Sequence, residues 1–164
     1  MTIIPTQHSS LVGGSTAARR IGCPRSWALE QMVPPETGNS VYALEGSSLH
    51  ELFAVALEQD IEPVSLLPFK YTDPKTNESF TVTHALWHEK GEPALTALDM
   101  FVSAQENRLK APMRFLIEKR VEFPGIPGAF GTSDIIAQCG GEVAIMDFKF
   151  GNGIVPAEEN KQLM

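Results

Sequence analysis

Apolar residues recur every three or four positions in two stretches of the chain, and this spacing predicts two amphipathic helices. The first stretch runs from 48 to 60, and its apolar side consists of Leu49, Leu52, Phe53, Ala56 and Leu57. Ser48 and Glu51 stand three residues apart, as in a capping box, so we expect this helix to begin at Ser48. The second stretch runs from 93 to 109, and its apolar side consists of Leu95, Leu98, Phe101 and Val102.

Alternating apolar and polar residues predict three strands in the second half of the chain. One covers 113–123, and two more, 129–139 and 142–150, flank the pair Gly140-Gly141. Two strand-like runs joined by two glycines predict a hairpin with a two-residue turn. In that register Asp134 lies directly opposite Asp147, with side chains roughly 4.5–5.5 Å apart at Cβ.

The remaining segments complete the expected order of elements. Residues 1–15 are expected to be a loose leader, followed by short helices at 16–20 and 26–32. We expect 61–91 to be an irregular surface insertion with one short strand near 80–82. Residues 157–164 begin a helix without a terminator, which suggests a truncated chain. The sequence thus predicts a single domain over 1–164 with an α/β fold of α+β-like order, in which a sheet packs against at least one helix.

The composition is that of an ordinary globular domain. Hydrophobic residues make up 43% of the chain and charged residues 20%, and neither a membrane span nor a signal peptide is present. Two cysteines, Cys23 and Cys139, are too few for a disulfide framework and indicate a cytoplasmic protein with reduced thiols. The net charge of −7 argues against a general nucleic-acid binder, but not against an enzyme that holds nucleic acid at one site.

The two facing carboxylates are the feature that most needs an explanation. Like charges directly opposite each other destabilise a sheet. Lys149 projects on the same face as Asp147, because side chains alternate along a strand. A divalent cation between Asp134 and Asp147 would balance the charges, since Mg²⁺ is commonly bound through one or two carboxylates together with water and substrate phosphate. The alternative is a structural hairpin whose charges form a surface salt bridge.

These residues resemble the signature of the PD-(D/E)XK nuclease superfamily, which consists of an aspartate followed by Asp-x-Lys. Further motifs narrow the resemblance to the branch of RecB, lambda exonuclease and the CRISPR-adaptation nucleases. They are the segment 15–25 with its Cys-Pro-Arg ending, the segment from Gly46 to His50, and Gln162. Within that branch, the segments 131–134, 147–151 and 159–163 are most similar to a phage-associated group. The matching tyrosine after Gln162 would lie beyond Met164.

The resemblance implies both a fold and an activity. The fold is a restriction-endonuclease-like core: a central mixed sheet containing the antiparallel hairpin, flanked by helices, with the last helix and strand incomplete. The activity is that of a metal-dependent DNA nuclease of phage or prophage origin, either an exonuclease or a recombination nuclease. The implied metal ligands are His50, Asp134, Asp147 and the backbone carbonyl of Phe148. The implied catalytic residues are Asp134, Asp147, Lys149 and Gln162.

The cofactor that follows is Mg²⁺ or Mn²⁺, and the nitrogen ligand His50 favours Mn²⁺. An iron–sulfur cluster is not expected, because it requires four cysteines and the chain has two. We expect Cys23 to be a buried apolar residue instead. The implied partner is DNA, with a recombination protein as a further candidate and no membrane. The alternative function is a catalytically inactive nucleic-acid-binding or assembly module with the same fold.

Overall fold

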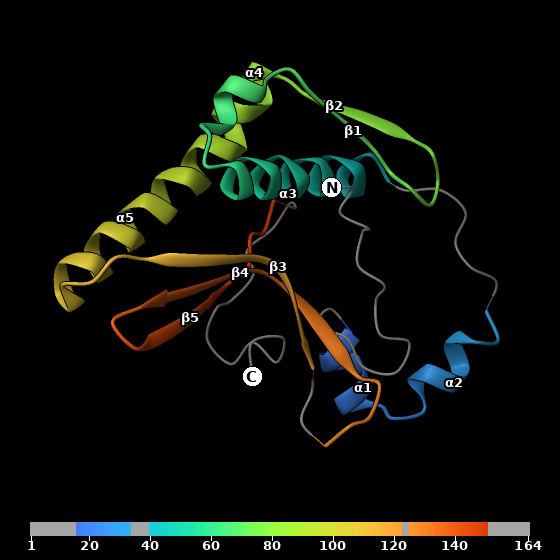
Figure 1. The fold of residues 1–164 in the computed structure, drawn as a ribbon. Helices are drawn as coiled ribbons and strands as arrows, with labels where there is room; N and C mark the ends of the chain where they lie inside the picture. The colour runs from blue at the N-terminus through green and yellow to red at the C-terminus, as the bar shows by residue number, and fades with distance from the viewer. Residues whose placement is uncertain (1–15, 34–39, 123–124, 151–164) are drawn as a thin grey trace.

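The computed structural model describes residues 16–33, 40–122 and 125–150. Helices combine with two antiparallel sheets, which confirms the α+β order expected from the sequence. Figure 1 shows α3 (Val41–Gln59) and α5 (Glu92–Leu109) on one side of a three-stranded sheet. The other helical elements are α1 (Ala17–Gly22), α2 (Ser26–Glu30), η2 (Pro63–Leu66), α4 (His84–Leu86) and η3 (Trp87–Gly91).

The three-stranded sheet has the order β3 (Arg114–Glu122), β4 (Phe130–Cys139), β5 (Glu142–Met146). The predicted hairpin register is confirmed, because Cys139 pairs with Glu142 and Ile135 pairs with Met146. However, β5 ends at Met146, so Asp147 lies one residue beyond the last paired position. The strand pairs among the described residues are all antiparallel, whereas the resemblance implied a mixed sheet.

Helix α3 begins earlier than the sequence predicted. Its N-cap is Ser40, whose side chain accepts a hydrogen bond from the Ala43 amide at 3.1 Å. Ser48 is fully buried in the middle of the helix, and its hydroxyl donates to the Glu45 carbonyl at 2.8 Å. The predicted start at Ser48 is therefore wrong, because the helix continues through Gly46 to an earlier serine that satisfies its first free amides.

The segment 61–91 is more regular than the sequence suggested. The expected strand is present as β2 (Ser79–Val82), and it pairs with a second strand, β1 (Phe69–Thr72), which was not expected. The segment also contributes Val82 and Trp87 to the protein interior, where both are almost fully buried. It is therefore a hairpin with short helical turns that packs against α3, and not an irregular surface excursion.

The core consists of two neighbouring clusters. One cluster packs α3 against the β1–β2 hairpin and against the segment that follows β5. Its buried residues are Leu49, Leu52, Phe53, Val82, Trp87 and Phe150. The other joins α5 to the three-stranded sheet through Leu98, Ile135 and Ala137. The opposite face of this sheet leaves Leu116, Val143 and Ile145 exposed. Among the described elements, helices α3 and α5 therefore pack against one face of this sheet.

The remaining predictions concern Cys23, membrane-spanning segments and the two ends of the chain. Cys23 is exposed, so the expectation of a buried apolar cysteine is wrong: the cysteine lies between two short helices rather than beneath them. In the part of the chain that the structure describes, no helix combines the length and apolar character that a bilayer crossing requires. The leader at 1–15, the helix start at 157–164 and Gln162 lie outside the described residues.

Candidate functional site

Helix α3 and strand β4 bring His50 and Asp134 together. His50 Nδ1 lies 3.2 Å from Asp134 Oδ2, and both side chains are largely buried, with 30% and 16% of their surfaces exposed. The same carboxylate oxygen accepts a hydrogen bond of 2.7 Å from the backbone amide of Phe148. One oxygen of Asp134 therefore links a helix, a strand and the segment that follows β5.

Two aromatic rings anchor the segment after β5. Phe148 and Phe150 stack on each other with ring centroids 5.5 Å apart, and both rings also contact Phe53 of α3. The His50 ring meets Phe150 edge-on at 5.1 Å. This aromatic contact fixes residues 147–150 against the helix even though they do not belong to a strand.

Asp147 and Lys149 alternate with these two aromatic residues along the same segment. The side-chain ammonium of Lys149 forms an ion pair with the Asp147 carboxylate. Lys149 keeps 41% of its side-chain surface exposed, whereas Asp147 keeps 16%. Among the described residues, Asp147 therefore forms its ion pair with Lys149.

Glu118 is an acidic residue of the same neighbourhood that sequence reasoning did not select. It occupies the position on β3 opposite Asp134, between the paired residues Ile117↔Ile135 and Lys119↔Ser133. The pKa of Glu118 is raised from 4.5 to about 7, chiefly by burial and then by the nearby Asp134 carboxylate, while His50 opposes the shift. A partly buried carboxyl facing another carboxyl holds its proton to unusually high pH.

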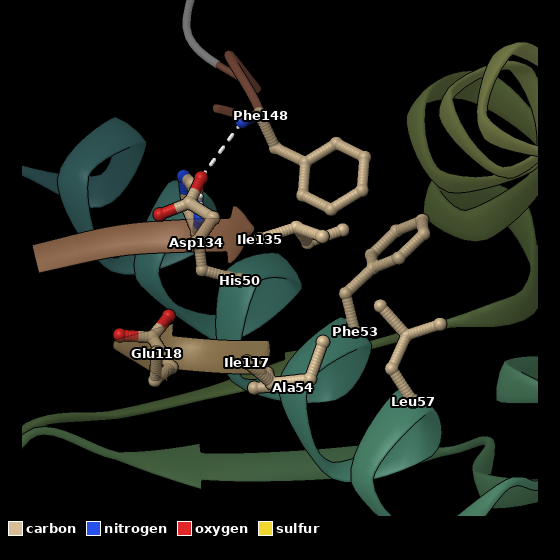
Figure 2. A pocket seen from close by; sticks show the side chains of 9 residues that line it. All are labelled: His50, Phe53, Ala54, Leu57, Ile117, Glu118, Asp134, Ile135 and Phe148. Atoms are coloured by element: carbon tan, nitrogen blue, oxygen red, sulfur yellow. Dashed lines mark hydrogen bonds and ion pairs between the residues drawn. The ribbon is translucent and has the colours of Figure 1, made fainter. Parts of the chain in front are cut away.

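Figure 2 shows the carboxylates of Asp134 and Glu118 at one end of a small pocket and the rings of Phe53 and Phe148 at the other. The cavity has a volume of about 10 Å³. That is about the least space that holds one water molecule. A nucleotide does not fit inside, so any large substrate must approach the carboxylates from the surface.

The structure joins part of the expected set of site residues. His50 and Asp134 meet, and Phe148 reaches Asp134 through its amide. Asp147 and Lys149 follow on the adjoining segment as a pair of their own. Within residues 16–33, 40–122 and 125–150, no group of three or more His, Cys, Asp or Glu side chains is arranged to hold a metal ion. Gln162 lies outside these ranges.

Glu118 could have been found from the sequence by extending the register to β3. The strand at 113–123 was expected, and an antiparallel pairing with β4 sets Glu118 against Asp134. What the sequence did not indicate is the left-handed backbone of Glu118, with φ of 46°. Such a conformation is uncommon for a residue with a side chain and interrupts ordinary strand alternation.

A family model described as "Protein of unknown function (DUF2800)" matches residues 8–164. No solved structure matches the chain. This family description names no activity.

Proposed function

We propose that the chain, which belongs to the DUF2800 family of proteins of unknown function, is a metal-dependent nuclease that hydrolyses phosphodiester bonds in DNA. The observation that carries this proposal is the contact between His50 and Asp134, which come from different elements and lie 3.2 Å apart. A buried imidazole and carboxylate beside a second Asp and a lysine are the residue types that such chemistry uses. The proposed setting is the cytoplasm of a bacterial or phage-infected cell, with a recombination protein as a candidate partner.

The donor atoms fit a divalent cation in part. The His50 nitrogen and the Asp134 carboxylate are close enough to share an ion, and a mixed nitrogen and oxygen set suits Mn²⁺ as well as Mg²⁺. Asp147 and the Phe148 carbonyl are the proposed remaining ligands. The bound ion would supply Lewis-acid chemistry to the scissile phosphate and to water.

The protein's own groups have separate tasks in this proposal. The Phe148 amide holds the Asp134 carboxylate in one orientation by its 2.7 Å hydrogen bond. Lys149 contributes a half-exposed ammonium that offsets negative charge developing on the phosphate. The aromatic rings of Phe53, Phe148 and Phe150 pack together beside the site and form an apolar surface. An apolar surrounding strengthens electrostatic interactions.

Cleavage of labelled DNA in the presence of Mg²⁺ or Mn²⁺ tests the proposal. Wild-type protein should cut, and EDTA should stop the reaction. Asp134→Asn, Asp147→Asn and Lys149→Gln are expected to slow cleavage at least about a hundredfold, because each removes a charge that acts on the transition state. Asp99→Asn, at an exposed position on α5, is the matched control and should cut like the wild type.

Two results would contradict the nuclease. One is wild-type protein that leaves single-stranded and duplex DNA intact with both metals. The other is cleavage that survives Asp134→Asn and Asp147→Asn together, which would trace the activity to a contaminant or to another site.

A second candidate is a nucleic-acid-binding or assembly module without turnover. The ion pair between Asp147 and Lys149, and the lack of a three-ligand group among the described residues, favour this alternative. It predicts that Mn²⁺ raises the melting temperature of the protein while no DNA substrate is cut. Cleavage that depends on Asp134 would exclude it.

A further inference from the structure

Strands β3 and β4 continue beyond the three-stranded sheet as a two-stranded ribbon. Beyond the pair Ile135↔Met146, β4 has no β5 partner, and among the residues that the structure describes its residues 130–133 pair only with residues 119–122 of β3. Figure 1 shows these strand ends extending past β5 and away from α5. We call residues 118–122 and 130–134 the β3–β4 ribbon. It begins at the two carboxylates of the candidate site, Glu118 and Asp134.

One face of the β3–β4 ribbon carries an arginine in line with Asp134. Side chains alternate along a strand, so Phe130, Thr132 and Asp134 project from the same face of β4. Arg120 is paired with Thr132 and therefore lies on this face. Two residues of a strand span roughly 7 Å, and a nucleic-acid strand carries one negative charge per about 3.4 Å of axis. Arg120 therefore stands about two nucleotides from Asp134.

Arg120 is held in place by an aromatic ring rather than by a close carboxylate. Its guanidinium carbon lies 3.6 Å from the centroid of the Phe130 ring. Its ion-pair partner is Glu122 at 3.8 Å, and both side chains are more than half exposed, so this pair contributes little. Stacking on a ring restrains the guanidinium while leaving its N–H groups pointing outwards for an anion.

The other arginines with described ion pairs are engaged much more closely. Arg108 forms a two-pronged contact with Glu142 at 2.6 and 3.0 Å. Arg19 and Arg20 bind the carboxylate of Glu30 at 2.7 and 2.6 Å. Those pairs neutralise the positive charge locally, whereas the fork of Arg120 is poised to bind phosphate in the two-pronged manner typical of arginine.

We propose that Arg120, stacked on Phe130, binds a backbone phosphate of a DNA strand that runs along the Asp134, Thr132 and Phe130 face of the β3–β4 ribbon. This inference rests on the proposed nuclease function, because it takes Asp134 as the point of cleavage. Arg120 is then a substrate-binding residue that sets which phosphate reaches the site. Its contribution is to affinity and register along the strand.

Fluorescence anisotropy with a labelled DNA oligonucleotide in EDTA measures this contact without cleavage. Arg120→Gln is expected to weaken binding on the order of tenfold, as for the loss of a charge-assisted hydrogen bond. The slope of log K against log salt should become shallower by about 0.7 to 0.9, the change expected for one lost phosphate contact. Arg120→Lys should bind with intermediate affinity, because it keeps the charge without the fork.

Lys119→Gln is the matched control. Lys119 is the next residue of the same strand, is also exposed, and projects from the opposite face of the β3–β4 ribbon. It should bind like the wild type. Phe130→Leu is a second test variant that keeps Arg120 but removes the ring beneath it, and it should also weaken binding.

Equal losses for Arg120→Gln and Lys119→Gln would overturn the proposal, because they would indicate a general charge effect. Unchanged binding by Arg120→Gln, or a wild-type protein that binds no DNA, would overturn it as well. A separate cleavage assay with Mn²⁺ keeps the two proposals apart. Binding that depends on Arg120 without any cleavage would support the strand path and reject the nuclease. Cleavage with a KM that is insensitive to Arg120→Gln would support the nuclease and reject the binding of DNA along the β3–β4 ribbon.

Discussion

Glu118 is the residue at which strand β3 leaves ordinary geometry. Its φ of 46° is left-handed, and its partly buried carboxyl has a pKa of about 7. The groups that face it are Asp134, His50, Glu51 and Glu58, and only His50 favours its ionised form. Strained residues tend to gather where a protein positions side chains for function.

The pH dependence of stability follows from this shift. Because folding raises the pKa of Glu118 from 4.5 to about 7, the folded state binds more protons than the unfolded state between these values. The free energy of unfolding of the metal-free protein should therefore fall as pH rises through this window. Glu118→Gln should flatten that dependence and be more stable than the wild type above pH 7. Urea unfolding in EDTA at several pH values measures it.

Glu122→Gln serves as the control for this experiment, since Glu122 is the exposed last residue of the same strand. A Glu118→Gln protein with the wild-type pH profile would show that another group causes the dependence.

At the scale of single residues, the sequence predicted the hairpin register, which the structure confirms from Cys139↔Glu142 to Ile135↔Met146. The predicted pair of Asp134 and Asp147 lies beyond the last paired position. The contact of His50 with Asp134 was expected only from the resemblance, because no local pattern links a helix to a distant strand. The position of Glu118 opposite Asp134 follows from the register of β3 and β4, but its left-handed backbone does not, because residue type does not favour that conformation.

At the scale of elements, α3 separates two serines that look alike in the sequence. Ser40 caps the helix, whereas Ser48 is buried inside it. Ser40→Ala should lower the free energy of unfolding by about 1 kcal/mol, because it removes the side-chain hydrogen bond that caps the helix at the Ala43 amide. Ser48→Ala should change it by no more than about 0.5 kcal/mol, since alanine favours helix and the Glu45 carbonyl stays within the helical ladder. Chemical denaturation measures the free energy of unfolding of both variants. A larger loss for Ser48→Ala than for Ser40→Ala would indicate that the helix begins at Ser48, as the sequence predicted.

Helix α5 and strand β3 were predicted within one or two residues, because their apolar periodicity is regular. The β1 strand was not predicted, because it has only four residues. So short a segment, between Pro68 and the polar segment 73–79, shows too little alternation of apolar and polar residues. Its partner Val82 is buried by contacts with α3 and Trp87, and such tertiary packing cannot be derived from a short segment alone.

At the scale of the whole molecule, the described helices α3 and α5 pack on one side of the three-stranded sheet. The sheet rests on α5 and α3, and its other face exposes Leu116, Val143 and Ile145 at 39%, 63% and 53%. The register sets Leu116 and Ile145 in one row across Ile136, so these residues form a continuous apolar strip. Contiguous apolar surface of this kind promotes association.

Sedimentation velocity over a range of protein concentrations should therefore show self-association of the wild-type chain. Ile145→Lys should reduce it, because a charge in the middle of the apolar strip opposes contact between sheets. Ile61→Lys, which adds the same charge at an exposed position after α3, should not. A wild-type protein that sediments as one species at all concentrations would contradict this expectation.

The amide of Phe148 has a consequence for spectroscopy. The amide proton of Phe148 belongs to the segment that carries Asp147 and Lys149. It is donated to the oxygen of Asp134 that also contacts His50. Its exchange with deuterated solvent therefore reports on the assembly of the site itself, independently of global unfolding. The rate of exchange of this one amide proton thus shows whether His50, Asp134 and the segment after β5 are in contact or apart.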